Sequence, residues 1–294
     1  MTSLFCRHNR LTAKCPICSR ELEAELRAKA PPRPGAPRRS ASSAPSRTRR
    51  AAPGGLVTRK LARAADDGYR NLLVPGLRAT ADAERLAAAI AAGAARLEPP
   101  GPYEAVAAEP DREQASWLAF LLALAGPDDP GRQAEIAAAE PPFADAAPEG
   151  LPARAIASYR QWAAKAGSQS AAFLGEPDWS PARRFARVFE RLALPGLSRA
   201  TRFELLVTLG TAGVYELEAG ELALGGDDDA TTAAAKRVLA SGDKMLLERR
   251  ARELADTAAV PLAALDRGLA LWGAPNAELD AAAPATVRAA LGLR

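Results

Sequence analysis

The sequence predicts an all-α protein, and two observations lead to this fold class. Hydrophobic residues make up 48% of the 294-residue chain but aromatic residues only 5%. Much of the apolar content is Ala, joined by Leu, with few of the Val, Ile and Tyr residues that strands favour. The second observation is that one helical stretch follows another from about residue 55 onward, with Pro and Gly between them.

Composition divides the chain into three zones. Residues 1–30 hold a compact Cys/His cluster that runs into a short charged helix. Residues 31–54, PPRPGAPRRSASSAPSRTRRAAPG, have no apolar period, so we expect a disordered basic linker. Residues 55–294 are expected to form the helical domain, because they are numerous enough to enclose a core.

Within this domain the sequence predicts helices over residues 58–72, 79–97, 111–125, 152–166, 181–193, 199–210, 229–240, 243–258 and 261–272. The stretch REQASWLAFLLALAG is apolar nearly all round, which predicts a central buried helix. The segment YELEAGELALGG is a candidate for a short β-hairpin.

Charge is distributed unevenly along the chain. Residues 1–60 carry 14 Lys and Arg and three Glu, a net charge of +11, whereas the remainder carries 25 basic and 32 acidic residues, a net charge of −7. A cationic arm on an acidic body indicates contact with a phosphate backbone. The alternative is a solvated tail that only keeps the protein in solution.

Nothing in the sequence predicts a membrane partner. No apolar run approaches the roughly 20 residues that a membrane-spanning helix needs. The N-terminus has no apolar core of the kind found in signal peptides. We therefore expect a cytoplasmic protein.

All three cysteines and the only histidine fall within thirteen residues, as Cys6, His8, Cys15 and Cys18. Four such ligands meet the requirement of a closed tetrahedral Zn²⁺ site, and the CPIC spacing lets both thiolates reach one ion. The alternative, a disulfide beside an uninvolved histidine, is disfavoured by the odd number of cysteines. We expect a structural zinc ion, since the set has no open position for catalysis, and no organic cofactor.

The segment LPGLSRATR, residues 194–202, connects two helical stretches and is a candidate phosphate-binding turn. A glycine allows the backbone to pass close to a phosphate, and the next helix points its N–H groups at the anion. Gly196 meets that requirement, with Ser198 as a second small residue and Thr201 in the first turn of the next helix. An ordinary packing turn between helices is the alternative.

This segment resembles the hairpin of the helix-hairpin-helix superfamily of DNA glycosylases, which reads L-P-G-V-G-x-x-T-A. The matching residues are Leu194, Pro195, Gly196 and Thr201. The departures are Leu197, Ser198 and Arg202. The position of the lysine nucleophile of bifunctional members is Ala200, so the resemblance implies a monofunctional enzyme without a Schiff-base step.

A second similarity lies downstream, where the superfamily places a catalytic aspartate before a helix that continues K-R-V-L. This chain reads GGDDDATTAAAKRVLASGD, with Asp227, Asp228 and Asp229 before Lys236 and Arg237. The eight-residue separation of Asp229 from Arg237 is about one helical turn longer than the family pattern. Without realignment Thr232 falls on the aspartate position, and an aspartate that only caps its helix is the alternative.

Together RRFARVFERLALPGLSRATRFELLVTLG, DDATTAAAKRVLASGDKMLLERRA and HNRLTAKCPICSRE resemble the α-glutamyl/putrescinyl-thymine pyrophosphorylase-like branch of the superfamily. That branch includes anti-phage glycosylases that excise glucosylated hydroxymethylcytosine. The resemblance implies base flipping and hydrolysis in double-stranded phage DNA, with Asp229 or Asp228 as the catalytic carboxylate. It implies DNA contacts by Gly196, Ser198, Arg199, Thr201, Arg202, Lys236 and Arg237.

Two other functions fit the same motifs. One is an enzyme of this fold that builds a hypermodified thymine, and the other is a DNA-binding module without chemistry. Five more residues are candidates for lining the base pocket, namely Tyr159, Trp162, Gln169, Glu176 and Trp179. For the aromatic residues among them, a place in the core is the alternative.

Overall fold

The computed structural model describes residues 64–98, 103–144, 149–226, 228–274, 277, 279 and 281–294. The chain divides into two units, residues 1–58 and 59–294, and all described residues belong to the second unit. The predicted zinc knuckle of residues 1–30 and the predicted linker of residues 31–54 therefore lie outside the described residues.

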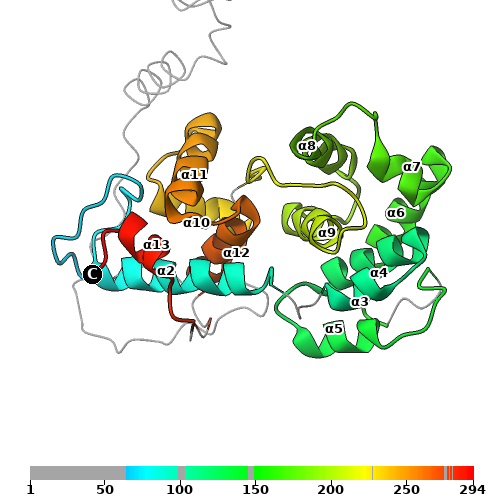
Figure 1. The fold of residues 1–294 in the computed structure, drawn as a ribbon, viewed down its shortest axis with the longest axis horizontal. Coiled ribbons are helices and arrows are strands. Elements are labelled where there is room, and N and C mark those ends of the chain that lie inside the picture. Colours follow the sequence, from blue (N-terminus) through cyan, green and yellow to red (C-terminus); the bar gives the residue numbers. More distant parts are fainter. Residues whose placement is uncertain are drawn as a thin grey trace, which may run out of the picture. The chain divides into compact units, whose positions relative to one another are not determined.

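The described part of the chain contains helices and no strand, which confirms the all-α fold class (Figure 1). The helices are α2 (Thr80–Ala95), α3 (Glu104–Ala108), α4 (Arg112–Ala125), α5 (Pro130–Ala137), α6 (Ala153–Ala166), α7 (Gln169–Leu174), α8 (Pro181–Arg191), α9 (Arg199–Thr211), α10 (Ala230–Val238), α11 (Lys244–Ala258), α12 (Leu262–Gly273) and α13 (Ala285–Ala290). Among the described helices, none has the length and apolar character needed to cross a membrane.

Two predicted elements are wrong. Residues 64–72 are not helical, because the Asp66 and Asp67 carboxylates accept hydrogen bonds from the N–H groups of Gly68 and Tyr69, both at 3.0 Å. Such side-chain acceptors compete with helix formation. The predicted hairpin of residues 215–226 contains no strand, since the N–H groups of Leu222 and Leu224 bind the Glu248 carboxylate rather than a neighbouring strand.

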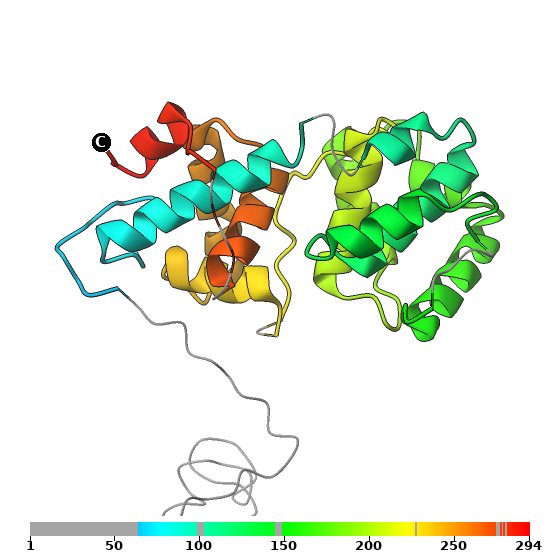
Figure 2. The same ribbon diagram turned by 90° about the horizontal axis from the view of Figure 1, so that it is seen from below.

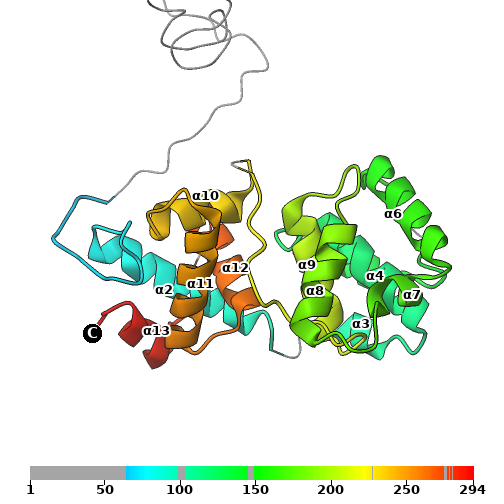
Figure 3. The same cartoon turned by 90° about the horizontal axis from the view of Figure 1, so that it is seen from above.

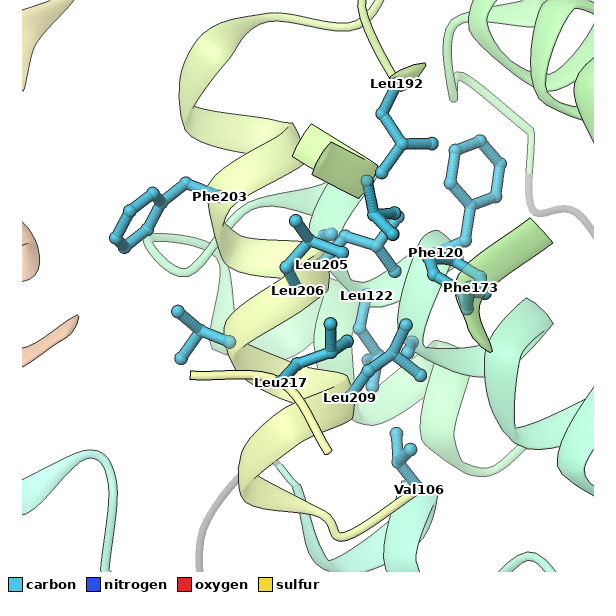
Figure 4. Close-up of a cluster of buried hydrophobic side chains, with 14 of the residues drawn as sticks. Val106, Phe120, Leu122, Phe173, Leu192, Phe203, Leu205, Leu206, Leu209 and Leu217 are labelled. Carbon is cyan, nitrogen blue, oxygen red and sulfur yellow. The ribbon is translucent and has the colours of Figure 1, made fainter. Parts of the chain in front are cut away.

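The first hydrophobic core is built around α4 and α9. The prediction of a central buried helix is confirmed, because α4 is buried from Ala115 to Ala123 except at Trp117. Figure 4 shows Leu205, Leu206 and Leu209 of α9 gathered with side chains of α4 in this core. Helices α8 and α9 lie side by side (Figure 3), so the connection between them is a tight turn at the edge of the core.

The second core is formed by α2 and the C-terminal helices. In Figure 2 the cyan helix α2 lies against the orange and red C-terminal helices. Close packing of α2 on α12 depends on Gly268, where an added Cβ would lie 2.8 Å from the Ile90 Cα atom. Trp272 is the only aromatic residue among the fully buried members of this core. Helix α10, which follows the predicted catalytic aspartate, packs on α12 in the same core.

Candidate functional site

The turn between α8 and α9 has the backbone that its sequence predicts. Gly196 has a φ of +89°, in the left-handed region that glycine adopts without strain. The Leu197 N–H donates to the Leu194 carbonyl at 3.1 Å, and the Leu197 side chain is buried. Ser198 caps α9, because its Oγ accepts from the Thr201 N–H at 3.0 Å. The turn is therefore a closed, capped connection.

One side of this turn is already occupied by α6. A Cβ on Gly196 would lie 3.0 Å from the Ala155 N atom, and Ser158 Oγ donates to the Pro195 carbonyl at 2.9 Å. The close backbone approach that explains this glycine is thus an approach to α6. Gly196 and Ser198 are nevertheless exposed, so the turn also has a solvent-facing side.

Arg199 is turned away from solvent, contrary to its expected role as a surface cation. It is 6% exposed, and its Nη2 donates to the Leu222 carbonyl and to the Asp266 carboxylate. Its guanidinium also lies 4.5 Å from the ring centre of Phe203. Arg199 therefore binds groups inside the protein rather than facing the solvent.

Two of the other predicted cations, Arg202 and Arg237, lie over aromatic rings. Arg202 lies 4.2 Å from the ring centre of Phe189 and donates to the Phe189 carbonyl at 3.1 Å. Lys236 and Arg237 are in the last turn of α10, at the end opposite Asp229. Arg237 lies 4.8 Å from the ring centre of Trp272. Arg202 is therefore the cation beside the turn, whereas the α10 pair lies roughly 10 Å along the helix axis from Asp229.

Asp229 caps α10. Its Oδ2 accepts from the Thr232 N–H at 2.8 Å and from Thr232 Oγ1 at 2.7 Å. Thr232 Oγ1 in turn accepts from the Gly225 N–H at 2.9 Å, which links Gly225 to Asp229 through Thr232. Asp228 is exposed beside it, and Asp227 lies outside the described residues. A carboxylate at this position is also stabilised by the positive end of the helix dipole.

The structure brings Asp229 to the beginning of α9. Gly225 lies between the two: a Cβ at this glycine would be 3.4 Å from the Arg199 Cβ and 3.7 Å from the Asp229 Cβ. The charges of Arg199, Arg202 and Asp229 interact with one another. Burial and the Arg199 charge lower the pKa of Arg202, while the Asp229 carboxylate acts in the opposite direction. Asp229 thus lies beside the first turn of α9, which follows the α8–α9 turn.

Asp266 is a member of this site that the sequence analysis missed. Its side chain is 14% exposed, and burial raises its pKa, opposed by Arg199 and reinforced by Asp229 and Glu204. The available signal was an acid inside the apolar helical stretch LAALDRGLALW. Nothing local in that stretch indicates which residue neutralises the acid, because Arg199 lies 67 residues away in the chain.

Two cavities lie in this part of the molecule, one along α11 and one beside α9 and α12. One, of about 620 Å³, lies along the first turns of α11 beside Glu221, and the other, of about 300 Å³, lies between α9 and the first turn of α12. Asp229 lines neither of these two. Because Asp229 lies beside Arg199 at the beginning of α9, the candidate site is taken to be this contact across Gly225.

The remaining candidates divide between core and surface. Tyr159 is fully buried and stacks on Phe120 at 3.8 Å, and its hydroxyl donates to Gln169 at 2.6 Å. Trp162 stacks on Tyr159 at 5.4 Å. Tyr159 and Trp162 belong to the first core, in agreement with the core alternative. Glu176 is exposed, and the ring of Trp179 lies against Gly175.

No family model, curated protein or solved structure matches this chain. The predicted zinc ligands Cys6, His8, Cys15 and Cys18 lie outside the described residues. In the part of the chain that the structure describes, no group of three His, Cys, Asp or Glu side chains is arranged to hold a metal ion.

Proposed function

We propose that this protein is a monofunctional DNA glycosylase that removes a modified base, glucosylated 5-hydroxymethylcytosine, from double-stranded phage DNA in anti-phage defence. The observation that carries the proposal is the meeting of Asp229 with the beginning of α9 across Gly225. Arg199 and Asp229, to which the resemblance assigned DNA contact and chemistry, are thereby neighbours although they lie 30 positions apart in the chain.

The proposed reaction needs one carboxylate and one water. The target nucleotide leaves the stack, and the bond between the base nitrogen and the sugar C1′ breaks with its electron pair going to the base. Positive charge then develops on the sugar, and the Asp229 carboxylate stabilises it. Water adds to C1′, its proton passes to Asp229, and an abasic site remains.

The local geometry suits this role for Asp229. Both of its hydrogen bonds among the described residues end on Oδ2, where the two Thr232 donors fix the carboxylate. We assign Oδ1 to the sugar and the water. Asp228 is exposed next to it, so we treat it as the alternative carboxylate. Ala200 is exposed at the lysine position, which is consistent with hydrolysis without an amine nucleophile.

DNA contact is proposed for the solvent side of the α8–α9 turn and for the basic N-terminal residues. Gly196, Ser198 and Thr201 offer backbone and hydroxyl donors there, and Arg202 is the nearest cation. The +11 charge of residues 1–60 would add contacts that weaken with salt.

The test is incubation of the full-length protein with duplex DNA that carries glucosylated 5-hydroxymethylcytosine, followed by alkali. Strand breaks that depend on both alkali and the modified base are expected. Asp229→Asn should lower the rate by about 10³-fold, because the carboxylate acts on the developing charge. Asparagine caps helices as well as aspartate, so folding should be preserved.

Asp243→Asn is the matched control, since Asp243 caps α11 in the same way, with Oδ1 accepting from the Leu246 N–H at 2.7 Å. It should keep full activity. Loss of activity in Asp228→Asn instead would move the catalytic role to Asp228. If the wild-type protein binds DNA but releases no base, the chain is a binding module and the proposal is wrong.

A further inference from the structure

A buried ion pair lies next to the proposed catalytic carboxylate. Arg199 is the first residue of α9 and Asp266 lies in α12, so the pair joins helices of the two hydrophobic cores. The side chains are 4% and 14% exposed, respectively. Water therefore screens this pair little, and its charges act strongly on their neighbours.

The surroundings of Arg199 do not satisfy all of its donors. Nε donates to the Ala223 carbonyl at 3.3 Å, and Nη2 donates to the Leu222 carbonyl and Asp266. Nη1 is buried without a hydrogen-bond partner. An unsatisfied buried donor costs stability, so an apolar pair would stabilise this contact at least as well. A role beyond stability would explain why charged residues occupy these positions.

The contacts of Arg199 lead to Asp229. Arg199 holds the carbonyls of residues 222 and 223, just before Gly225, and Gly225 packs on the stem of the Arg199 side chain. Gly225 is tied through Thr232 Oγ1 to the Asp229 carboxylate. A movement of Arg199 would therefore displace the segment that carries Asp229.

The charges around the pair come from three elements. Helix α9 contributes Arg199, Arg202 and Glu204, α12 contributes Asp266, and the N-terminus of α10 contributes Asp229. Glu204 is already bound at 2.5 Å by Arg96, the residue that follows α2. The two cations Arg199 and Arg202 then balance the two carboxylates Asp266 and Asp229; Arg199 binds Asp266 directly, and the Arg202 charge interacts with Asp229.

We propose that Asp266 and Arg199 are positioning residues for Asp229, which rests on the proposed glycosylase function. Asp266 neutralises Arg199, so that Arg199 shapes the loop without forming an ion pair with Asp229. The Asp229 carboxylate thereby keeps its negative charge without an ion pair to Arg199, at the place where the sugar develops positive charge. Without Asp266, Arg199 would turn its charge and its unpaired Nη1 toward Asp229.

The first measurement is the pH profile of base release. Asp266→Asn should lower kcat roughly 10²-fold, as expected when a reacting group is displaced or neutralised. The acidic limb of the pH profile should move to lower pH, because an uncompensated Arg199 favours the ionised form of the catalytic carboxylate. Asp266→Glu should recover part of the rate.

A matched control exists on the same helix. Asp128→Asn breaks the ion pair of Arg267 with Asp128, which also joins α12 to the α4–α5 region at 2.5 Å. It should leave the rate and the profile unchanged. Should Asp266→Asn fold poorly, the double variant Arg199→Met with Asp266→Leu replaces the pair by apolar side chains. A stable double variant with wild-type kcat and profile would overturn the proposal.

A second measurement does not depend on enzyme activity. The titration of the Asp266 carboxyl, followed by carbon NMR in the full chain, should shift to lower pH in Asp229→Asn, because one nearby negative charge is lost. Asp228→Asn should shift it less. An unchanged Asp266 titration in Asp229→Asn contradicts the coupling, whereas an inactive wild-type protein with the expected shift contradicts only the glycosylase function.

Discussion

The two hydrophobic cores of residues 59–294 are packed by different means. The first core fills its space with rings: Trp117, Phe120, Tyr159, Trp162, Phe173 and Tyr215 form a continuous chain of contacts between 3.8 and 5.7 Å. The second core brings backbones together, and Gly93 and Gly268 allow α2 to lie directly on α12. One core is therefore sensitive to lost volume, and the other to added volume.

The difference shows what each core does for the candidate site. The ring-filled core holds α9 and its turn, whereas the close-packed core holds α10 and α12, with Asp229 and Asp266. The site depends on both, since the Arg199–Asp266 pair has one partner in each. If the two cores unfold together, a substitution that destabilises one core lowers the stability of the whole domain, and the site stays intact in the molecules that remain folded. If one core unfolds alone, the same substitution also disrupts the site.

The largest effect is expected for Phe120→Ala. Phe120 is fully buried and stacks on Tyr159 at 3.8 Å, so its removal leaves a cavity and should cost about 4 kcal/mol of unfolding free energy. Denaturant unfolding measures the loss, and hydrogen exchange of α4 and α12 reports on the two cores separately. Loss of protection in α4 alone would mean that the cores unfold independently.

The next largest is expected for Gly268→Ala. The new Cβ would meet the Ile90 Cα at 2.8 Å and the Ile90 N at 3.0 Å, and backbone atoms cannot move aside locally. The cost should be about 2 to 3 kcal/mol. Gly242→Ala is the control, because nothing lies within 4 Å of its added Cβ. Equal unfolding midpoints for the two variants would contradict close packing of α2 on α12.

A smaller change is expected for Tyr159→Phe, which keeps the ring contacts. It removes the hydroxyl that donates to Gln169 at 2.6 Å and leaves a buried acceptor unpaired, at about 1 to 2 kcal/mol. Comparison with Phe120→Ala separates the hydrogen bond from ring volume. A loss as large as that of Phe120→Ala would assign the strength of this core to polar contacts.

The smallest effect is expected for Glu113→Gln, and it depends on pH. Burial alone would raise the pKa of Glu113, but hydrogen bonds from Ser170 and Gln169 outweigh burial and lower it. A depressed folded-state pKa contributes stability above the unfolded value of 4.5, which is lost as pH falls through the folded value. The stability difference between wild type and Glu113→Gln should therefore disappear in acid. A difference that is constant from neutral pH to acid would contradict this.

The sequence by itself determined where most of the long helices begin and which one is buried. Each of four helices begins after a capping side chain that accepts from an N–H group three residues further along the chain, so the signal is local and can be recognised in the sequence. The four capping residues are Ser180, Ser198, Asp229 and Asp243. The apolar stretch of α4 predicted its burial. The sequence analysis did not predict the short helices α3, α5, α7 and α13, because five to eight residues do not establish a helical period.

Only the tertiary structure decided how these elements form a site. Arg199 was expected at the surface and is buried, and Asp266 was not expected at all, because the partner of each is 67 residues away. The sequence does not indicate the role of Gly225, which the structure places between Arg199 and Asp229. Capping and periodicity act within a few residues, whereas the neutralisation of a buried charge is settled when distant helices pack together.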